Sequence, residues 1–400
     1  MTTSRDTSAQ VRQSAAELIG EDTRAEIFGL VLTAGPLSRT HLAERLGLAP
    51  STITRLLPPL LEAGYLREEP TQGTGPGRPQ RLLSVNLERH LVVGVKIAPT
   101  HVSAVVTDMG AQVVARAEES IADCLPGTAL AAAARMTGEL LAGIPGAAER
   151  TLGLGVGLSG HVDAVTGVCR YSGLLGWNEV KVAEPLARAT GLTVAVANDV
   201  NALVVAERWF GSGRDVDTFA LVTVGPGIGC GLLLDGTLFT GATGLAAEFG
   251  HIPIDPAGPA CTCGRRGCLE ALASSGSVLN RLHQAGIHCA DFDQAAALAR
   301  EGAGADARAA RAAFAAAGDA LGRGLATLCN LLNPSKIIIA GEGVSTHDLF
   351  RPAMDEALAY HGFSTAAVDC DIQIDAVTDD LWARGAACLV IKDTVRAPLS

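Results

Sequence analysis

The stretch GPGIGCGLLLDGTLFTGATGLAAEFGHIPIDPAGPACTCGRRGCLE, residues 225–270, holds the strongest local signals in the chain. One imidazole and three thiols fall within eighteen of its residues, at His251, Cys261, Cys263 and Cys268. This donor set is typical of a closed tetrahedral zinc site, and glycines in the loop permit the tight turn that the site needs. The alternative interpretation is that the three cysteines are buried free thiols that pack as small hydrophobic side chains. Their Cys-x-Cys spacing, in a loop rich in Pro, Gly and Arg, disfavours this alternative. Because four protein ligands leave no open position, we predict a structural zinc ion.

Polar side chains lie on both sides of this metal motif. Asn198-Asp199 follows a short apolar strand pattern and precedes a predicted helix over 200–209, whereas Glu248 and Glu270 flank the motif itself. Polar groups at the carboxyl end of a strand, beside a helix N-terminus, are well placed to bind a ligand in an α/β fold. With His251 they form a set suited to the hydroxyl groups of a sugar. Each has a plainer interpretation, since Asn198-Asp199 could cap the helix and Glu248 could be a surface charge.

The pattern ahead of residue 90 predicts three short helices followed by a hairpin. The first helix begins near Thr23 and stops at Gly35-Pro36, Ser38 caps the second, and Gly47 ends it. The third opens at Pro50. Two helices joined by a tight glycine turn form a DNA-reading unit whose second helix enters the major groove, and the hairpin would be its wing.

Small hydroxyl and arginine side chains of this segment suit phosphate and base-edge contacts. The candidate DNA ligands are Arg39, Ser51, Thr52, Thr54, Arg55 and Arg78. Arg78, within Gly77-Arg78-Pro79 of the wing loop, could enter a narrow minor groove. Pro58-Pro59 should kink the third helix or end its first segment near Leu57. The alternative is a small helical docking domain whose arginines are solvated surface charges.

Composition narrows the class of protein. With 48% hydrophobic and 18% charged residues, the 400-residue chain is neither disordered nor a coiled coil. The net charge of −11 disfavours a uniformly basic nucleic-acid binder. Residues 1–90 hold ten Arg and ten acidic residues, so the excess negative charge lies in the rest of the chain. No secretory signal pattern is visible at the start, and the apolar run Phe219–Leu234 is broken by Gly and Pro. We therefore expect a cytoplasmic protein with reduced thiols and no membrane partner.

The chain resembles the ROK family (repressors, open reading frames and kinases) from about residue 22 to 395. The matching motifs are LGLAPSTITRLLPPLLEAGYL, GVGLSGHVD, GLLGW, VANDVNA, GPGIGCGLLLDGTLFTGATGLAAEFGH, CTCGRRGCLE, NLLNPSKIIIAGEG and ARGAA. The resemblance implies an α/β protein in which a winged helix-turn-helix precedes a two-lobed, actin-like (ribonuclease H-like) ATPase fold. The winged helix indicates the regulator branch, because the family's sugar kinases lack it.

The resemblance also implies domain limits. Residues 1–20 would be a flexible tail, 21–88 the winged helix-turn-helix domain and 89–400 the ROK sugar-binding domain. Within the latter, lobe one would cover about 89–208 plus a C-terminal helix at about 382–396, and lobe two about 209–381. The implied sugar ligands are Asn198, Asp199, Glu248, His251 and Glu270, with the backbone near Gly160 helping. In family kinases the position of Asp199 is the base that deprotonates the attacking hydroxyl, and the position of His251 contacts both zinc and sugar.

The phosphate-binding motifs depart from the family's pattern. Where the family has Asp-x-Gly-Gly-Thr, this chain has Lys96-Ile97-Ala98-Pro99-Thr100, and Gly-Thr-Gly-x-Gly has become Gly225-Pro226-Gly227-Ile228-Gly229. Gly341-Glu342-Gly343 carries a carboxylate where a third glycine is usual. Phosphoryl transfer depends on positioning and on neutralising phosphate charge, so these changes predict a protein without kinase activity in which Asp199 is a vestigial base. Lys96 could still contact a phosphate directly, which leaves residual activity open.

Together these patterns predict a sugar-responsive transcriptional regulator, with repression as the expected sign. Its partners would be double-stranded operator DNA, a sugar or sugar phosphate effector, and further copies of the chain in a homodimer or homotetramer. One alternative is a hexose kinase with an attached DNA-binding domain. Another is a regulator controlled by protein docking rather than by free sugar.

Overall fold

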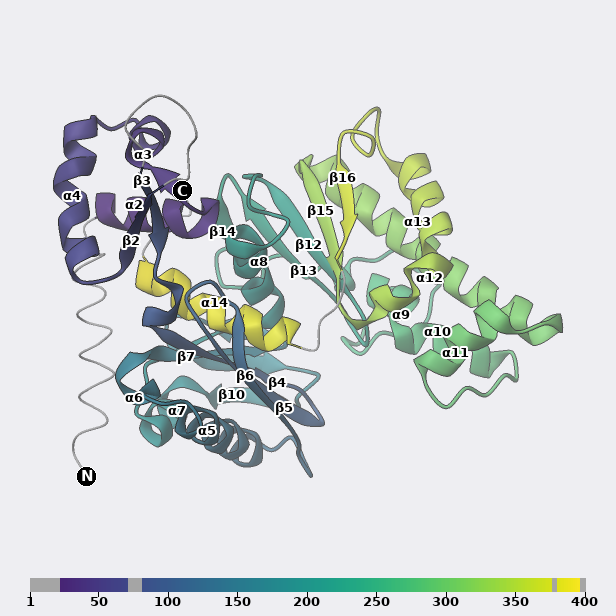
Figure 1. Ribbon diagram of the computed structural model, residues 1–400. Coiled ribbons are helices and arrows are strands. Elements are labelled where there is room, and N and C mark those ends of the chain that lie inside the picture. The colour runs from purple at the N-terminus through teal and green to yellow at the C-terminus, as the bar shows by residue number, and fades with distance from the viewer. Residues whose placement is uncertain (1–21, 71–80, 376–379, 396–400) are drawn as a thin grey trace. The chain divides into compact units, whose positions relative to one another are not determined.

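The computed structural model describes residues 22–70, 81–375 and 380–395 (Figure 1). These residues form two compact units. Unit 1 comprises the chain up to Arg214 together with the segment from Asp380 onward, and unit 2 comprises Asp215–Asp379. Within the described ranges, no helix combines the length and apolar character needed to cross a membrane.

Unit 1 begins with a winged helix-turn-helix. Its elements are α2 (Asp22–Ala34), β1 (Leu37–Ser38), α3 (Arg39–Leu46), α4 (Pro50–Glu62), β2 (Leu66–Pro70) and β3 (Arg81–Val85). The three strands form an antiparallel sheet in the order β1-β3-β2. The hydroxyl of Ser38 accepts a hydrogen bond from the amide of His41 at 3.2 Å, and Gly47 ends α3 with a φ of 62°, so both predicted helix limits are confirmed. The wing loop with Arg78, like the tail 1–20, lies outside the described residues.

Helix α4 corrects one expectation. It continues through Pro58 and Pro59 to Glu62, so the alternative in which the helix ends near Leu57 is wrong, whereas the expected kink stays a prediction. A proline inside a helix lacks an amide donor and its ring crowds the carbonyl four residues earlier, but packing can outweigh both effects. Leu57 and Leu60, on either side of the prolines, are both fully buried. The amide of Ala63 still donates to the Pro59 carbonyl at 3.1 Å.

The rest of unit 1 is an α/β layer structure. Its elements are η1 (Leu87–Arg89), β4 (Leu91–Ile97), β5 (His101–Thr107), β6 (Val113–Ser120), α5 (Pro126–Ala142), α6 (Ala147–Arg150), β7 (Thr151–Leu158), β8 (His161–Asp163), β9 (Val168–Ser172), β10 (Trp177–Lys181), α7 (Ala183–Thr190), β11 (Val194–Asn198), α8 (Asp199–Phe210) and α14 (Leu381–Val395). Five strands form one sheet in the order β11-β7-β4-β5-β6, and β8–β10 form a small second sheet. Strands β4 and β7 are buried along their whole length, as expected for the centre of a covered sheet.

Helix α14 returns from the far end of the chain to lie along this sheet (Figure 1). Two strand glycines allow its backbone to approach the strands directly. A Cβ atom added at Gly94 would lie 1.9 Å from the Ala383 carbonyl oxygen, and one at Gly155 would lie 1.9 Å from that of Ala386. No side chain can therefore stand between helix and sheet at these points.

Unit 2 repeats the strand order of unit 1. Its elements are β12 (Phe219–Val224), β13 (Ile228–Leu234), β14 (Thr237–Phe239), η2 (Phe249–His251), α9 (Leu269–Ala273), α10 (Ser275–Gln284), α11 (Phe292–Glu301), α12 (Gly304–Leu332), β15 (Lys336–Ala340), η3 (Glu342–Thr346), α13 (His347–His361) and β16 (Asp371–Ile374). The sheet order is β14-β13-β12-β15-β16, with β12–β14 antiparallel and β12, β15 and β16 parallel. Unit 1 has the same three antiparallel and two parallel strands. The predicted α/β class with two similar lobes is confirmed.

The contact between α14 and the sheet gives a first prediction. Gly155→Ala should lower the free energy of unfolding by about 3 kcal/mol, because the methyl group meets a backbone oxygen that only a shift of the helix can move. Chemical denaturation measures the change. Gly138→Ala is the matched control: nothing lies within 4 Å of the added methyl group in α5, so stability should be unchanged or slightly higher. Equal effects of the two substitutions would contradict this account of the packing.

Candidate functional site

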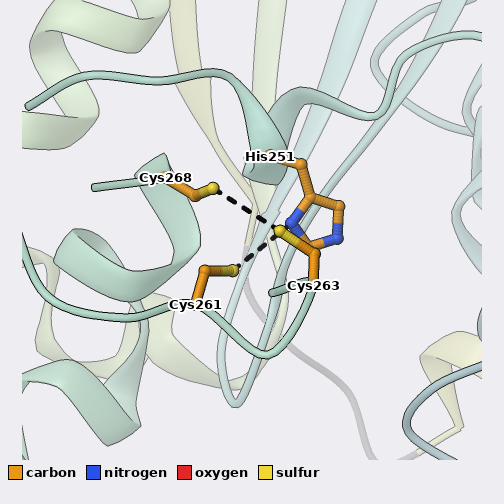
Figure 2. Close-up of side chains that lie close together, drawn as sticks. All are labelled: His251, Cys261, Cys263 and Cys268. Carbon is orange, nitrogen blue, oxygen red and sulfur yellow. Dashed lines mark hydrogen bonds between the residues drawn. The ribbon is translucent and has the colours of Figure 1, made fainter. Parts of the chain in front are cut away.

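The four metal-motif side chains lie together in unit 2 (Figure 2). His251 ends η2, Cys261 and Cys263 lie in the following loop, and Cys268 directly precedes α9. Their ligand atoms all lie within 4.8 Å of one another. The sequence-predicted ligand set is therefore brought to one point.

The spacing of these atoms fits zinc. The Sγ atoms of Cys263 and Cys268 are 3.7 Å apart, and Cys261 Sγ is 3.6 Å from His251 Nδ1. Tetrahedral zinc with ordinary bond lengths would place two sulfurs about 3.8 Å apart and a sulfur and a nitrogen about 3.6 Å apart. Because Nδ1 faces the sulfurs, the other ring nitrogen of His251 remains available for a second partner.

The loop backbone builds this cluster with two glycines. Gly264 has a φ of 86° and Gly267 one of 65°. A Cβ atom at Gly267 would lie 1.5 Å from the Asp255 carbonyl oxygen, which excludes any side chain there. The Cys261 amide donates to the Arg265 carbonyl at 2.8 Å and closes the loop between the cysteines.

The thiols differ in their readiness to ionise. The backbone amide of Arg265 donates to Cys263 and helps to hold its pKa below the ordinary value. Burial, reinforced by hydrogen bonds with the neighbouring thiols, raises the pKa of Cys268 to about 12. Three adjacent thiolates need a cation to coexist, and a divalent metal ion supplies one.

Two carboxylates of unit 2 lie near the motif in sequence but have different environments. Glu248 is exposed and directly precedes η2. Glu270 is half-buried in α9, where its carboxylate accepts from the Ile228 amide and from the Thr262 hydroxyl, each at 3.3 Å. Glu270 therefore ties the metal loop to the turn that enters β13.

On unit 1, Asn198 caps the N-terminus of α8, as its plainer interpretation predicts. Its side-chain oxygen accepts from the amides of Val200 and Asn201 at the start of α8. Its amide nitrogen donates to the Gly160 carbonyl at 3.0 Å, which joins two of the candidate sugar ligands. Gly160 has a φ of 103°, and a Cβ atom there would lie 2.3 Å from the Tyr171 carbonyl oxygen, so the turn requires glycine.

Asp199 has a partner that the sequence did not reveal. The ammonium of Lys96, near the end of β4, forms a short ion pair with Asp199 Oδ2 at the start of α8. Both residues are buried, with 9% and 6% of their surface exposed. Lys96 Nζ also lies 4.8 Å from the ring centroid of Trp382 on α14. Nothing local in the sequence marks Trp382, because its partners are far away along the chain.

The glycine turn between β12 and β13 is occupied by the protein's own groups. The amide of Gly225 donates to the Gly227 carbonyl, that of Ile228 to Glu270, and that of Gly229 to the Thr223 hydroxyl. Pro226 has no amide proton. A carboxylate oxygen of Glu342 lies over the turn, 2.6 Å from where a Cβ atom of Gly225 would stand.

The candidate DNA ligands divide into two groups. Ser51, Thr54 and Arg55 are exposed on α4, and Thr52 is half-buried. Arg39 is bound within the winged domain, with its Nη2 2.7 Å from Glu68 on β2, and Arg81 pairs with the same carboxylate at 3.2 Å. Burial opposes ionisation of Glu68, but the two arginines outweigh it and hold its pKa below the ordinary value.

Comparisons with known proteins bear on both parts of the chain. A family model described as the ROK family matches residues 92–393, and one described as the IclR helix-turn-helix domain matches residues 26–70. The xylose repressor of Caldicellulosiruptor bescii is 26% identical over 398 residues, which are 95% of this chain and 98% of that protein. The crystal structure of a ROK family transcriptional regulator, a homologue of the E. coli MLC protein, matches with a TM-score of 0.81 and 25% identity, covering 97% of this chain and 98% of that one.

A kinase also matches, over a smaller share of the chain. The glucokinase of Thermotoga maritima is 37% identical over 251 residues, which are 59% of this chain and 78% of that protein. The matched regulators extend over almost the whole chain, including the helix-turn-helix, whereas this match is confined to a shorter part.

The metal cluster gives a second prediction. Cys263→Ser should lose the bound ion, because three ligands remain from a four-ligand set. Cys263 is exposed, so little packing is lost with it, and a lower melting temperature would report loss of the metal. At free zinc a thousand times the dissociation constant, that loss amounts to about 4 kcal/mol. Metal analysis should find one zinc ion per wild-type chain and almost none in the variant.

The half-buried Cys289, outside the cluster, provides the control for this experiment. Cys289→Ser removes a thiol but no proposed ligand, so its zinc content should equal that of the wild type. Equal zinc content in Cys263→Ser and the wild type would contradict the assignment.

Proposed function

Because the chain belongs to the ROK family over residues 92–393 and carries a helix-turn-helix ahead of that region, we propose that it is a sugar-responsive repressor of transcription. The observation that carries the proposal is the union of a helix-turn-helix domain with a ROK domain in one chain. The xylose repressor that matches nearly end to end supports the same assignment. We propose that it acts in the cytoplasm and that its targets are genes of carbohydrate metabolism.

The DNA-binding part of the proposal rests on α4. Its first turns present Ser51, Thr54 and Arg55 to solvent, while Ile53 and Leu57 hold the helix on the domain core. Two such heads on a homodimer, or two dimers in a tetramer, would read the half-sites of a palindromic operator. Arg78, in the wing, is proposed to contact the minor groove. Arg39, which is paired with Glu68, would contribute by orienting the wing.

The sugar-binding part rests on two sets of residues. Asn198, Asp199 and the Gly160 backbone form the set on unit 1, where one hydrogen-bond network holds Asn198 and Gly160 together. Glu248, His251 and Glu270 form the set on unit 2, where the metal cluster and the Glu270 contacts fix their surroundings. We propose that the bound ion is zinc with a structural role. We propose that the protein exchanges between two conformations, one of which binds the operator more tightly. The sugar would bind the other conformation more tightly, and sugar binding would therefore lower the affinity for the operator.

We also propose that the protein does not phosphorylate its sugar. The vestigial base Asp199 is paired with Lys96, so one of its carboxylate oxygens already has a partner within the protein. The amides of Gly225, Ile228 and Gly229 in the glycine turn already have protein acceptors, and Glu342 adds negative charge over the turn. Ala98 and Pro99 replace the glycines of the other phosphate motif. The match to a glucokinase keeps a kinase with a DNA-binding domain as the second candidate.

A complementary pair of substitutions tests the two halves of the proposal. Arg55→Ala should weaken operator binding about 10- to 100-fold, because it removes a phosphate or base contact, and should leave sugar affinity unchanged. Asp199→Ala should do the reverse, weakening sugar binding by about 10- to 100-fold through loss of a charged hydrogen-bond partner. Fluorescence anisotropy with operator DNA and calorimetry with sugars give the two affinities.

Arg308, exposed on α12 of unit 2, is the control for charge alone. Arg308→Ala should bind the operator as tightly as the wild type at the same salt concentration. An operator loss as large as that of Arg55→Ala, or loss of DNA binding in a folded Asp199→Ala, would contradict the division of labour.

Absence of kinase activity is a separate prediction. With MgATP and a panel of D-glucose, D-mannose, D-xylose and N-acetyl-D-glucosamine, the purified chain should form no more ADP than a sample without sugar. A coupled assay for ADP measures this. Sugar-dependent ADP formation that disappears in Asp199→Asn would instead establish the kinase.

A further inference from the structure

The environment of Lys96 is unusual for a lysine side chain. Lys96 lies on β4, the middle strand of the five-stranded sheet of unit 1, and 9% of its surface is exposed. Its ammonium meets the carboxylate of Asp199 from α8 and the indole face of Trp382 from α14. A buried ammonium is costly without such partners. Three separate elements thus converge on one side chain.

Asp199 is held by this arrangement at both oxygens. Oδ2 contacts the Lys96 ammonium, and Oδ1 accepts from the Val200 amide at 2.9 Å. Each carboxylate oxygen has two lone pairs, so both can still accept a hydrogen bond from a ligand hydroxyl. The pair as a whole is electrically neutral, which allows a charged acceptor to be kept inside the protein.

We propose that Lys96 is a positioning residue of the sugar site, and that its ammonium is a built-in counter-cation that holds the Asp199 carboxylate oriented toward a sugar hydroxyl. This assignment rests on the proposed role of Asp199 as a sugar ligand. Because the protein itself supplies the positive charge, sugar binding needs neither a magnesium ion nor a nucleotide. Trp382 holds the ammonium in place through its aromatic face.

A double-mutant cycle tests the coupling between the two side chains. Lys96→Met and Asp199→Asn, each alone, should weaken binding of the tightest sugar of the panel about 10- to 100-fold. The double variant should bind no more weakly than the weaker single variant, because both substitutions remove the same interaction. Calorimetry on the full chain, with and without MgCl2, gives the affinities, and the wild-type value should not depend on magnesium.

Chemical rescue separates positioning from a structural role. Lys96→Ala leaves space for a small amine, so added methylammonium should restore part of the lost sugar affinity, whereas tetramethylammonium, which has no N–H donor, should not. Lys181→Ala is the control, because Lys181 lies exposed on β10 and pairs only with Glu184 among the ion pairs described. Its sugar affinity should equal that of the wild type.

The outcomes distinguish this assignment from the proposed function. Unchanged sugar affinity in Lys96→Ala, additive losses in the cycle, or a loss that methylammonium does not restore would overturn the role of Lys96 and leave the sugar-responsive repressor in place. If the wild type bound the operator but no sugar or sugar phosphate, the proposed function itself would fail, and this assignment with it. Should the single variants not fold, the neutral double variant still decides: wild-type sugar affinity in that variant would overturn the role of Lys96, and a 10- to 100-fold loss would support it.

Discussion

Direct backbone contact between α14 and the sheet of unit 1 is the constraint on which much of this unit depends. Gly94 and Gly155 bring the helix onto β4 and β7 with no side chain between them. The helix thereby delivers Trp382 to the end of β4, where Lys96 lies. It also contacts α2 of the winged domain. Helix α14 thus contacts both Lys96, the partner of Asp199, and helix α2 of the winged domain.

The changes that argue against catalysis share one electrostatic logic. A kinase site must attract phosphate and a divalent cation, so it needs free amide donors and carboxylates in the right places. In this chain a lysine neutralises Asp199, and carboxylates from Glu270 and Glu342 lie at the turn where amides would face a phosphate. Each change replaces an external ion by a side chain of the protein itself. The His251 and cysteine cluster and the Asn198–Gly160 contact, both among the proposed sugar and metal ligands, show no such replacement.

Local sequence patterns are enough to predict much of the fold and part of the candidate site. Ser38 and Gly47 were predicted as helix limits because capping and left-handed turns depend on a few neighbouring residues, and the metal ligands were predicted because their spacing is local. Pro58 and Pro59 suggested that the helix could end near Leu57. It continues because burial of Leu57 and Leu60 outweighs the effect of the two prolines. The pairing of Lys96 with Asp199 could not be predicted, since the two residues are 103 positions apart and meet only through the order of the strands. For the same reason Glu342 was noted as an added charge, but its position over Gly225 was not foreseen.

The occupied glycine turn has a consequence for what the protein can report to the cell. A sensor that kept open amides there would respond to adenine nucleotides as well as to sugar, and its output would mix nutrient supply with energy charge. The amides of Gly225, Ile228 and Gly229 are already committed to protein oxygens, so under the proposed function we expect this second input to be absent. Gene expression under such a regulator would follow the concentration of its sugar alone, in starved and well-fed cells alike.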